Sequence, residues 1–324
     1  MQDIADLVGV SRAAVSNALR GKGRLSDETR RLILQKAEEL AFSPSAFGRA
    51  LRTGRSHTFA LILPDFRMPL FAEFARAFAL AAKDCDMVMT VADSLGSLER
   101  QGEHLRDMDA RGVDAVVLVP MRGTALDELP LKRPLIVVDA ESNPRNAVAS
   151  DHHQGGALVA GHLADLGHRE VLLLGAGGQG GSRVNALRLQ GMRAVLTARG
   201  VTVHETLLPV APVAYEAARD YLAEWQPGRV TAIAASYDAL AVGALMALSA
   251  RGIRVPQDIS VTGFDDTVWG RITMPPLTTV RQDLDQVAQS ALAHALGMRK
   301  TPDLIPVTLV RRGSAAAPRP EGTS

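Results

Sequence analysis

The stretch Asp3-Ile-Ala-Asp-Leu-Val-Gly-Val-Ser-Arg-Ala-Ala-Val-Ser-Asn-Ala-Leu-Arg-Gly-Lys-Gly-Arg24 decides how the first part of this chain folds. Ile4, Ala5 and Val8 share one face of a short predicted helix, and Gly9 can take the positive φ of a tight turn. Ser11 suits the N-cap of a second helix, because its hydroxyl can accept from free N–H groups. The stretch therefore predicts two short helices joined by a glycine turn.

The outer face of the second helix carries only small, polar or cationic side chains. Val15, Ala18 and Leu19 face inward, which leaves Arg12, Ala13, Ser16, Asn17 and Arg20 outside. A helix with this surface can enter the major groove of DNA, where Arg12, Asn17 and Arg20 can reach bases or phosphates. The alternative is an ordinary helical hairpin whose polar face is only solvated.

Composition and charge are those of a globular protein with a basic first segment. Residues 1–57 hold 10 Lys+Arg and 6 Asp+Glu, whereas the remainder holds 26 and 29. This asymmetry is the footprint expected of a nucleic-acid contact. No apolar run is long enough to span a bilayer, and we expect no membrane partner. Cys85 is the only cysteine, which favours a reducing, cytoplasmic location.

A third helix and a short linker complete the first segment. Ser26 is predicted to start a helix that runs to about Leu40 and packs its face inward, with the core stripe Leu32, Ile33, Ala37 and Leu40. The segment 43–52 is only about two turns long and is marginal as a helix alone, so we expect a partner to stabilise it. The first helix lacks a capping residue, so we also expect a few residues before Met1, which an intact-mass measurement would reveal.

From residue 59 onward, short apolar runs alternate with helical stretches. The predicted strands are Phe59–Leu63, Met87–Ala92, Ala115–Val119, Leu135–Val138, Val171–Leu174, Val201–Val203, Ala232–Ala235, Ile259–Gly263 and Val307–Val310, the main ones buried on both faces. The two batches of β and α units predict two doubly wound parallel sheets with a ligand cleft between them. The tail, residues 314–324, is rich in Ala and Pro and is predicted to be disordered.

The order and spacing of many short motifs resemble those of the LacI/GalR family of bacterial transcription regulators. The matches include Gly9-Val-Ser11, Ala14-Val-Ser16, Ser43-Pro-Ser-Ala46, Arg49-Ala-Leu-Arg-Thr-Gly54, Leu166-Gly-His168-Arg169, Gly263-Phe-Asp-Asp266 and Pro276-Leu-Thr-Thr279. The resemblance runs from Asp3 to about Gly313. It implies an all-α helix-turn-helix headpiece (1–42), a hinge helix and linker (43–57) and an α/β body like that of periplasmic binding proteins (58–313). The body's N-subdomain would comprise about 58–151 and 281–313, and its C-subdomain about 152–280.

The resemblance also implies a repressor that binds double-stranded operator DNA as a homodimer. Residues Ser43–Arg52 would fold into a hinge helix on the DNA, with Leu51 wedged into the minor groove at the centre of the operator. The tail lacks a leucine heptad, so we expect a dimer and no larger assembly. The DNA-binding residues would be Ser11, Arg12, Ala13, Ser16, Asn17, Arg20, Ser43, Ser45, Ala46, Arg49 and Leu51.

The body of such a protein would bind a small effector between its two halves. The matching positions are Leu70, Phe71, Asp139, Arg188, Tyr237, Asp238 and Asp265, and Trp269 lies close enough to cover the site. Carboxylates, an arginine and aromatic rings suit a polyol. The family often has Asn at the positions of Met68 and Tyr237 and Asp-Asn at Asp151-His152. These departures favour a bulkier or partly apolar effector, such as a glycoside or a nucleoside, over an ordinary monosaccharide.

The main alternative is an NAD(P)-dependent oxidoreductase. Gly175-Ala-Gly-Gly-Gln-Gly180 reads as G-x-G-x-x-G after an apolar strand, and Glu205 follows about 25 residues later. That reading leaves the helix-turn-helix unexplained, so we expect neither an enzyme nor a cofactor. The histidines show no metal-ligand spacing, and no metal site is predicted.

Overall fold

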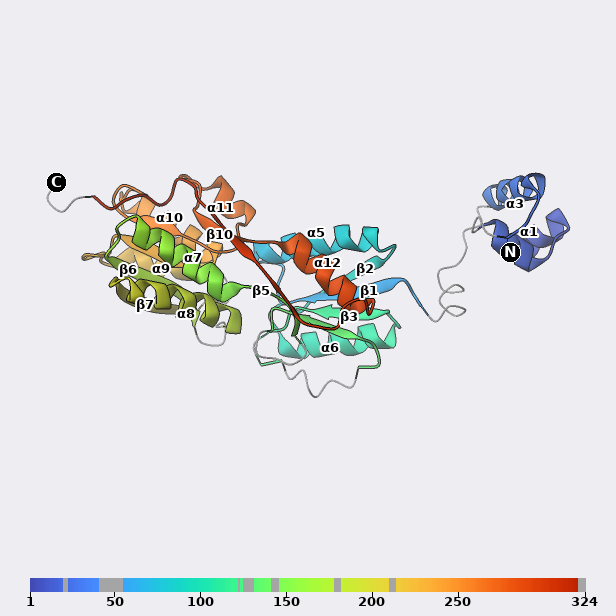
Figure 1. The fold of residues 1–324 in the computed structure, drawn as a ribbon, viewed down its shortest axis with the longest axis horizontal. Coiled ribbons are helices and arrows are strands. Elements are labelled where there is room, and N and C mark those ends of the chain that lie inside the picture. Colours follow the sequence, from blue (N-terminus) through green and yellow to red (C-terminus); the bar gives the residue numbers. More distant parts are fainter. Residues whose placement is uncertain are drawn as a thin grey trace. The chain divides into compact units, whose positions relative to one another are not determined.

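The computed structural model describes residues 1–19, 23–40, 55–121, 123–124, 131–140, 146–177, 182–209 and 214–319. The chain divides into two units, Met1–Ser56 and His57–Ser324 (Figure 1). The predicted body begins at residue 58, next to this boundary. The predicted hinge helix falls almost wholly on residues 43–54, outside the described residues.

The first unit is a three-helix domain made of α1 (Gln2–Val8), α2 (Arg12–Ala18) and α3 (Asp27–Glu39). Gly9 ends α1 with φ of 70°, and the Ser11 hydroxyl accepts from the N–H of Ala14, as the sequence predicts. The side chains buried in its core are Ile4, Ala5, Val15, Ala18, Ile33 and Ala37. Leu32 and Leu40 were predicted in the core but are 40% and 47% exposed, because so small a domain covers only a narrow stripe of α3.

The N-subdomain contains a six-stranded parallel sheet in the order β11-β5-β4-β3-β1-β2. Its strands and helices are β1 (Thr58–Leu63), α5 (Pro69–Asp84), β2 (Val88–Asp93), α6 (Leu98–Ala110), β3 (Ala115–Leu118), β4 (Leu135–Val138), β5 (Asn146–Ser150), α12 (Leu284–Ala295) and β11 (Asp303–Ile305). Helices α5 and α12 cover one face of the sheet and α6 covers the other. Strand β2 is not buried on both faces as predicted: it lies at the sheet edge, where Val88 is 66% exposed.

The C-subdomain contains a four-stranded parallel sheet in the order β7-β6-β8-β9. Its elements are α7 (His152–Asp165), β6 (Glu170–Gly177), α8 (Arg183–Ala198), β7 (Thr202–Pro209), α9 (Ala214–Glu224), β8 (Ala232–Ala235), α10 (Asp238–Ala250), β9 (Ser260–Thr262) and α11 (Val268–Ile272). Helices α7 and α8 pack on one face and α9 and α10 on the other. Both halves of the body therefore have the doubly wound plan that the sequence predicts.

The described chain passes between the two subdomains at three places: after β5, after β10 (Thr279–Gln282) and between β11 and β12 (Val307–Val310). Strand β12 pairs antiparallel with β10, and Val307 lies in the core of the C-subdomain. The predicted assignment of residues 281–313 to the N-subdomain therefore fails for residues 281–282 and from residue 307 onward. The apolar positions of β12 alone do not indicate whether it packs in the core of the N-subdomain or of the C-subdomain.

The segment from residue 314 to 319 is ordered along the C-subdomain, contrary to the predicted disordered tail. The Ser314 hydroxyl is fully buried, accepts from the N–H of Thr278 and donates to the carbonyl of Val261. The carbonyl of Ala316 lies 3.0 Å from Nε2 of His168 and accepts from the Ser260 hydroxyl. A segment without periodicity can thus be held by individual hydrogen bonds, which composition does not reveal.

Candidate functional site

The outer face of α2 presents the side chains predicted to contact DNA. Arg12 and Ala13 are exposed, and Ser16 and Asn17 are half-buried. The side chain of Asn17 lies against Gly23, where an added Cβ would come within 3.2 Å of its amide. Arg20 and the predicted contacts Ser43, Ser45, Ala46, Arg49 and Leu51 lie outside the described residues.

In the body, four ionisable side chains form a buried chain that joins the two subdomains. Asp139 follows β4 of the N-subdomain, and its Oδ1 lies 3.1 Å from Nε2 of His152 at the start of α7. Nε of Arg188 on α8 donates to Nδ1 of His152 at 3.3 Å. Its Nη2 donates to Oδ1 of Asp265 at 2.8 Å. Because Nδ1 accepts, His152 is the Nε2–H tautomer and donates to Asp139.

Arg188 is the most rigidly held of the predicted effector-binding residues. Its side chain is 1% exposed, and Nη1 donates to the carbonyl of Ser236 at 2.8 Å. The guanidinium carbon lies 3.8 Å from the ring centroid of Phe264 and 4.9 Å from that of Tyr237. These cation–π contacts and three hydrogen bonds hold the guanidinium in place without a ligand. The Tyr237 hydroxyl in turn lies 3.1 Å from the hydroxyl of Ser182.

The two carboxylates at the ends of this chain have opposite pKa shifts. Burial alone would raise the pKa of Asp139, but His152 and the N–H of Ser150 beside it lower that pKa below its ordinary value. Burial raises the pKa of Asp265, even though Arg188 stabilises its charged form. Burial also raises the pKa of Tyr237. The N-subdomain end of the chain thus holds its negative charge more firmly than the C-subdomain end.

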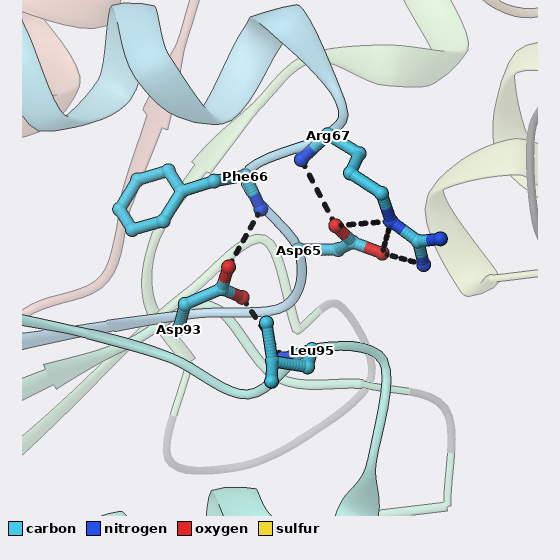
Figure 2. A pocket seen from close by; sticks show the side chains of 5 residues that line it. All are labelled: Asp65, Phe66, Arg67, Asp93 and Leu95. Atoms are coloured by element: carbon cyan, nitrogen blue, oxygen red, sulfur yellow. Dashed lines mark hydrogen bonds and ion pairs between the residues drawn. The ribbon is translucent and has the colours of Figure 1, made fainter.

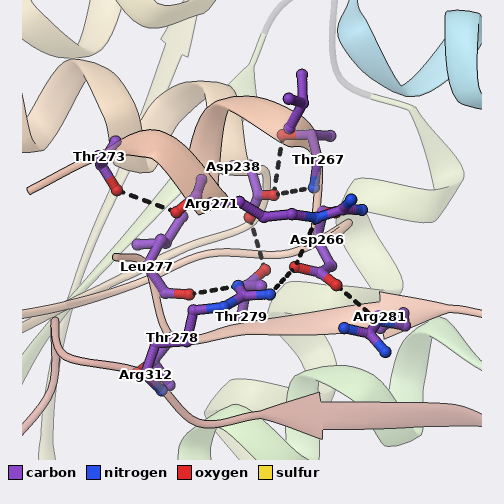
Figure 3. A network of polar contacts seen from close by, with 12 residues as sticks. Asp238, Asp266, Thr267, Arg271, Thr273, Leu277, Thr278, Thr279, Arg281 and Arg312 are labelled. Carbon is purple, nitrogen blue, oxygen red and sulfur yellow. Dashed lines mark hydrogen bonds and ion pairs between the residues drawn. The ribbon is translucent and has the colours of Figure 1, made fainter. Parts of the chain in front are cut away.

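Asp238, another predicted effector-binding residue, has both carboxylate oxygens engaged by its own subdomain (Figure 3). Oδ2 accepts from the N–H and hydroxyl of Thr267, and Oδ1 accepts from the hydroxyl of Thr279. An added Cβ on Gly263 would lie 2.4 Å from Oδ1, so the backbone is packed against the carboxylate. Burial, followed by the charge of Asp265, raises the pKa of Asp238 to about 7.

The predicted apolar contacts lie on two helices, one in each subdomain. Leu70 is buried with the core of the N-subdomain in the first turn of α5, and Phe71 packs against Phe74 with ring centroids 6.2 Å apart. Trp269 lies on α11 of the other subdomain and meets Tyr215 edge-on at 5.8 Å. These residues therefore flank the junction from both subdomains but do not contact the Arg188 guanidinium in any hydrogen bond or ring contact found among the described residues.

A cavity of about 540 Å³ lies at the carboxyl ends of β1 and β2. Figure 2 shows its lining residues, with Arg67 folded back onto Asp65 and the Asp93 carboxylate between Phe66 and Leu95. Arg67 binds both oxygens of Asp65, and this partner lowers the pKa of that carboxyl. The N–H groups of Phe66 and Leu95 donate to Asp93. No sequence pattern predicted this cavity.

His152, Gln282 and Phe264 join the buried chain although sequence reasoning did not place them in the site. Nε2 of Gln282 donates to Asp265, and its Oε1 is buried without a hydrogen-bond partner among the described residues. The Ser150 hydroxyl is likewise buried and unpartnered within the described part of the chain. The departure at Asp151-His152 was the one available signal, because an imidazole there replaces a smaller amide.

The Gly175–Gly180 motif has a packing role where the structure describes it. Gly175 and Gly177 lie within β6, and an added Cβ would come within 2.6 Å of Leu189 and 2.8 Å of Leu207, respectively. Residues 178–180 are outside the described residues. In the described ranges, no three His, Cys, Asp or Glu side chains gather as metal ligands, and no helix is long and apolar enough to cross a membrane.

A helix-turn-helix unit followed by a two-subdomain ligand-binding body defines a ligand-controlled DNA-binding regulator. Residues 1–45 match the model for bacterial regulatory proteins of the lacI family, and residues 160–315 match that for a periplasmic binding protein-like domain. A solved structure of a LacI-family protein from Sanguibacter keddieii is 32% identical, with a TM-score of 0.69; the match covers 80% of this chain and 98% of that one. The chain belongs to the LacI family of transcriptional regulators.

Two further relatives extend over nearly the whole chain. The ribose operon repressor of Haemophilus influenzae is 29% identical, and the match covers 94% of this chain and 92% of that protein. The lac repressor dimer bound to operator and the anti-inducer ONPF has a TM-score of 0.83 at 24% identity, covering 97% of this chain and 98% of that one. The comparisons give no support to the oxidoreductase alternative.

Proposed function

We propose that this regulator is a homodimeric repressor whose affinity for operator DNA is set by a small hydroxylated effector bound between the subdomains. The observation that carries this proposal is the buried chain Asp139–His152–Arg188–Asp265, which begins in one subdomain and ends in the other. A ligand that contacts this chain changes the balance between arrangements of the two subdomains.

The chemistry of the chain favours a ligand with several hydroxyl groups. Carboxylates accept O–H donors, while the arginine fork donates to ligand oxygens. The unpartnered Oε1 of Gln282 and hydroxyl of Ser150 add an acceptor and a donor–acceptor at the same junction. The names of the relatives agree, since one represses a ribose operon and the other binds ONPF.

Within this proposal, the predicted residues take two roles. Asp139, Arg188, Tyr237 and Asp265 face the effector from the buried chain or beside it, and Leu70, Phe71 and Trp269 provide its apolar walls. Asp238 supports the site through Thr267 and Thr279, because both its oxygens are already engaged. The aromatic side chains favour a glycoside or nucleoside over a simple monosaccharide.

The main test is selection of genomic DNA fragments by the purified full chain at near-physiological salt. We expect enrichment of one pseudo-palindromic sequence, and the genes beside it will define an effector panel. Calorimetry with ribose, glucose, an aryl glycoside and a nucleoside then tests the ligand class. Binding that weakens with salt but enriches no particular sequence would contradict a sequence-specific repressor.

Two substitutions test the proposed DNA contacts. Asn17→Ala should change sequence preference more than overall affinity, because its amide would read a base edge. Leu51→Ala should weaken operator binding while sparing nonspecific binding, because it would remove the wedge between base pairs. Fluorescence anisotropy with operator and scrambled duplexes measures both. Uniform weakening by Asn17→Ala, or unchanged operator affinity of Leu51→Ala, contradicts the assigned role.

The proposal also places the protein in the cytoplasm, on the nucleoid when it is bound to DNA, and gives it no catalytic activity. The glycines of β6 support this reading, because Leu189 and Leu207 explain why positions 175 and 177 lack a side chain. Titration with NAD(H) and NADP(H) should give no fluorescence change. A saturable change would restore the oxidoreductase alternative.

A further inference from the structure

The side chain of Glu73 on α5 links the two subdomains away from the buried chain. Its Oε1 accepts from the N–H of Val268 at the start of α11, with an N–O distance of 3.1 Å. Its Oε2 lies 3.6 Å from Nη2 of Arg271, one turn further along α11. Glu73 belongs to the N-subdomain and both partners belong to the C-subdomain, so the contacts cross the junction.

The start of α11 depends on Glu73 because its own capping residue is occupied elsewhere. Thr267 is the N-cap of α11 but makes no side-chain capping bond. Its hydroxyl donates to Asp238 instead, and its N–H does the same (Figure 3). The first-turn N–H of Val268 therefore finds its acceptor on the opposite subdomain.

Arg271 has partners on both sides of the junction. Its Nη2 donates to the carbonyl of Asp266 at 2.6 Å, and its Nε lies 3.6 Å from Oδ1 of that residue. Asp266 is fully buried and is also bound by Arg281 and Arg312, so it keeps a fixed position (Figure 3). When Glu73 withdraws, Arg271 keeps its contacts with Asp266, and Glu73 is solvated because it is 29% exposed.

We propose that Glu73 is a reversible clasp that holds the subdomains in the arrangement seen here. The clasp releases without leaving a buried unpaired charge on either side, which makes it a contact that can open and close. It joins the helix that carries Leu70 and Phe71 to the helix that carries Trp269. If the proposed function is right, closure of the clasp brings these predicted effector walls together; this consequence alone rests on that function.

The first experiment measures hydrogen exchange at the amide of Val268 in the full chain without DNA or ligand. Glu73→Ala should accelerate exchange at this amide by about threefold to tenfold, as expected for the loss of one ordinary hydrogen bond. Amides of β9 should keep their exchange rates. The matched control is Glu99→Ala, which removes an exposed glutamate on α6 of the same subdomain. It should leave exchange unchanged both at Val268 and in β9.

A second readout separates an interdomain clasp from a local helix cap. Spin labels at the exposed positions Glu103 on α6 and Glu224 on α9, in a Cys85→Ser background diluted with unlabelled chain, report the distance between subdomains. Glu73→Ala should lengthen or broaden that distribution. Glu73→Gln, which keeps an acceptor for Val268 but loses the charge opposite Arg271, should shift the distribution less and leave the amide largely protected.

Two results would overturn the clasp: unchanged exchange at Val268 in Glu73→Ala, or faster exchange with an unchanged distance distribution. Both readouts are independent of DNA and effector, so they stand even if the repressor proposal fails. Conversely, loss of operator selection with an intact clasp would count against the proposed function alone.

Discussion

The two subdomains share a parallel-sheet plan but contribute to the junction in different ways. The C-subdomain supplies side chains that are already locked, since Arg188 has three hydrogen bonds and two aromatic faces around it. The N-subdomain supplies Asp139 and the first turn of α5, next to an open cavity at β1 and β2. For the proposed effector site, the comparison means that the C-subdomain is the preorganised side and the N-subdomain the adjustable one.

The largest expected effect comes from breaking the preorganised side. Arg188→Met leaves the buried Asp265 without its cation, so the free energy of unfolding should fall by about 3–5 kcal/mol. Arg193→Gln on the same helix is the matched control. It breaks the exposed pair with Glu205 and should cost about 1 kcal/mol or less. Urea denaturation of both variants measures the difference, and equal losses would mean that Arg188 is not a buried anchor.

A second effect should distinguish the subdomains by the sign of the pH dependence of their stability. The pKa of Asp238 is about 7 in the folded state, above its ordinary 3.8, so the folded state binds the extra proton between these values. Its contribution to stability is therefore present at about pH 4 and is lost toward pH 7, by up to about 1.4 kcal/mol per pH unit. Denaturation across pH 4–8 should show this slope reduced in Asp238→Asn.

Asp139 on the other subdomain should behave in the opposite sense. Its pKa is lowered in the folded state, so its contribution is present above the ordinary pKa of 3.8 and is lost as the pH falls below it. Asp139→Asn should thus alter the acid limb of the profile and leave the slope between pH 5 and 7 intact. If Asp238→Asn and Asp139→Asn show the same slope of unfolding free energy between pH 5 and 7, the two carboxyls do not differ as assigned.

The smallest effect concerns the ordered tail behind the C-subdomain. Burial lowers the pKa of His168 to about 4, so the stability it contributes is present above pH 6.5 and decreases as the pH falls toward 4. Between pH 7 and 5 we expect a loss of about 2 kcal/mol in the wild type, absent from His168→Gln. Hydrogen exchange should show residues 314–319 loosening in parallel. If acid leaves those amides protected, His168 does not hold the tail.

The sequence predicted what depends on local pattern and missed what depends on distant pairing. Helix caps at Ser11 and Ser26 and the apolar strands β1, β3, β4 and β8 follow from periodicity and short-range hydrogen bonding. Asp238 pairs with residues 29 and 41 positions away, and Arg188 pairs with one 77 positions away. No short window of sequence contains such pairs, so the resemblance indicated candidate site residues but not their partners.

The contact between α7 and α8 also bears on how this site can evolve. A Cβ on Gly156 would lie 2.1 Å from the carbonyl oxygen of Arg188, and one on Gly191 would lie 2.0 Å from that of His153. The two helices therefore meet backbone to backbone, and the Cα positions of His152 and Arg188 are set by main-chain contact. In the proposed effector site, side chains around Arg188 can therefore change without moving the main chain that carries them. If an effector binds at this junction as proposed, single substitutions around Arg188 can alter its specificity, provided both glycines stay.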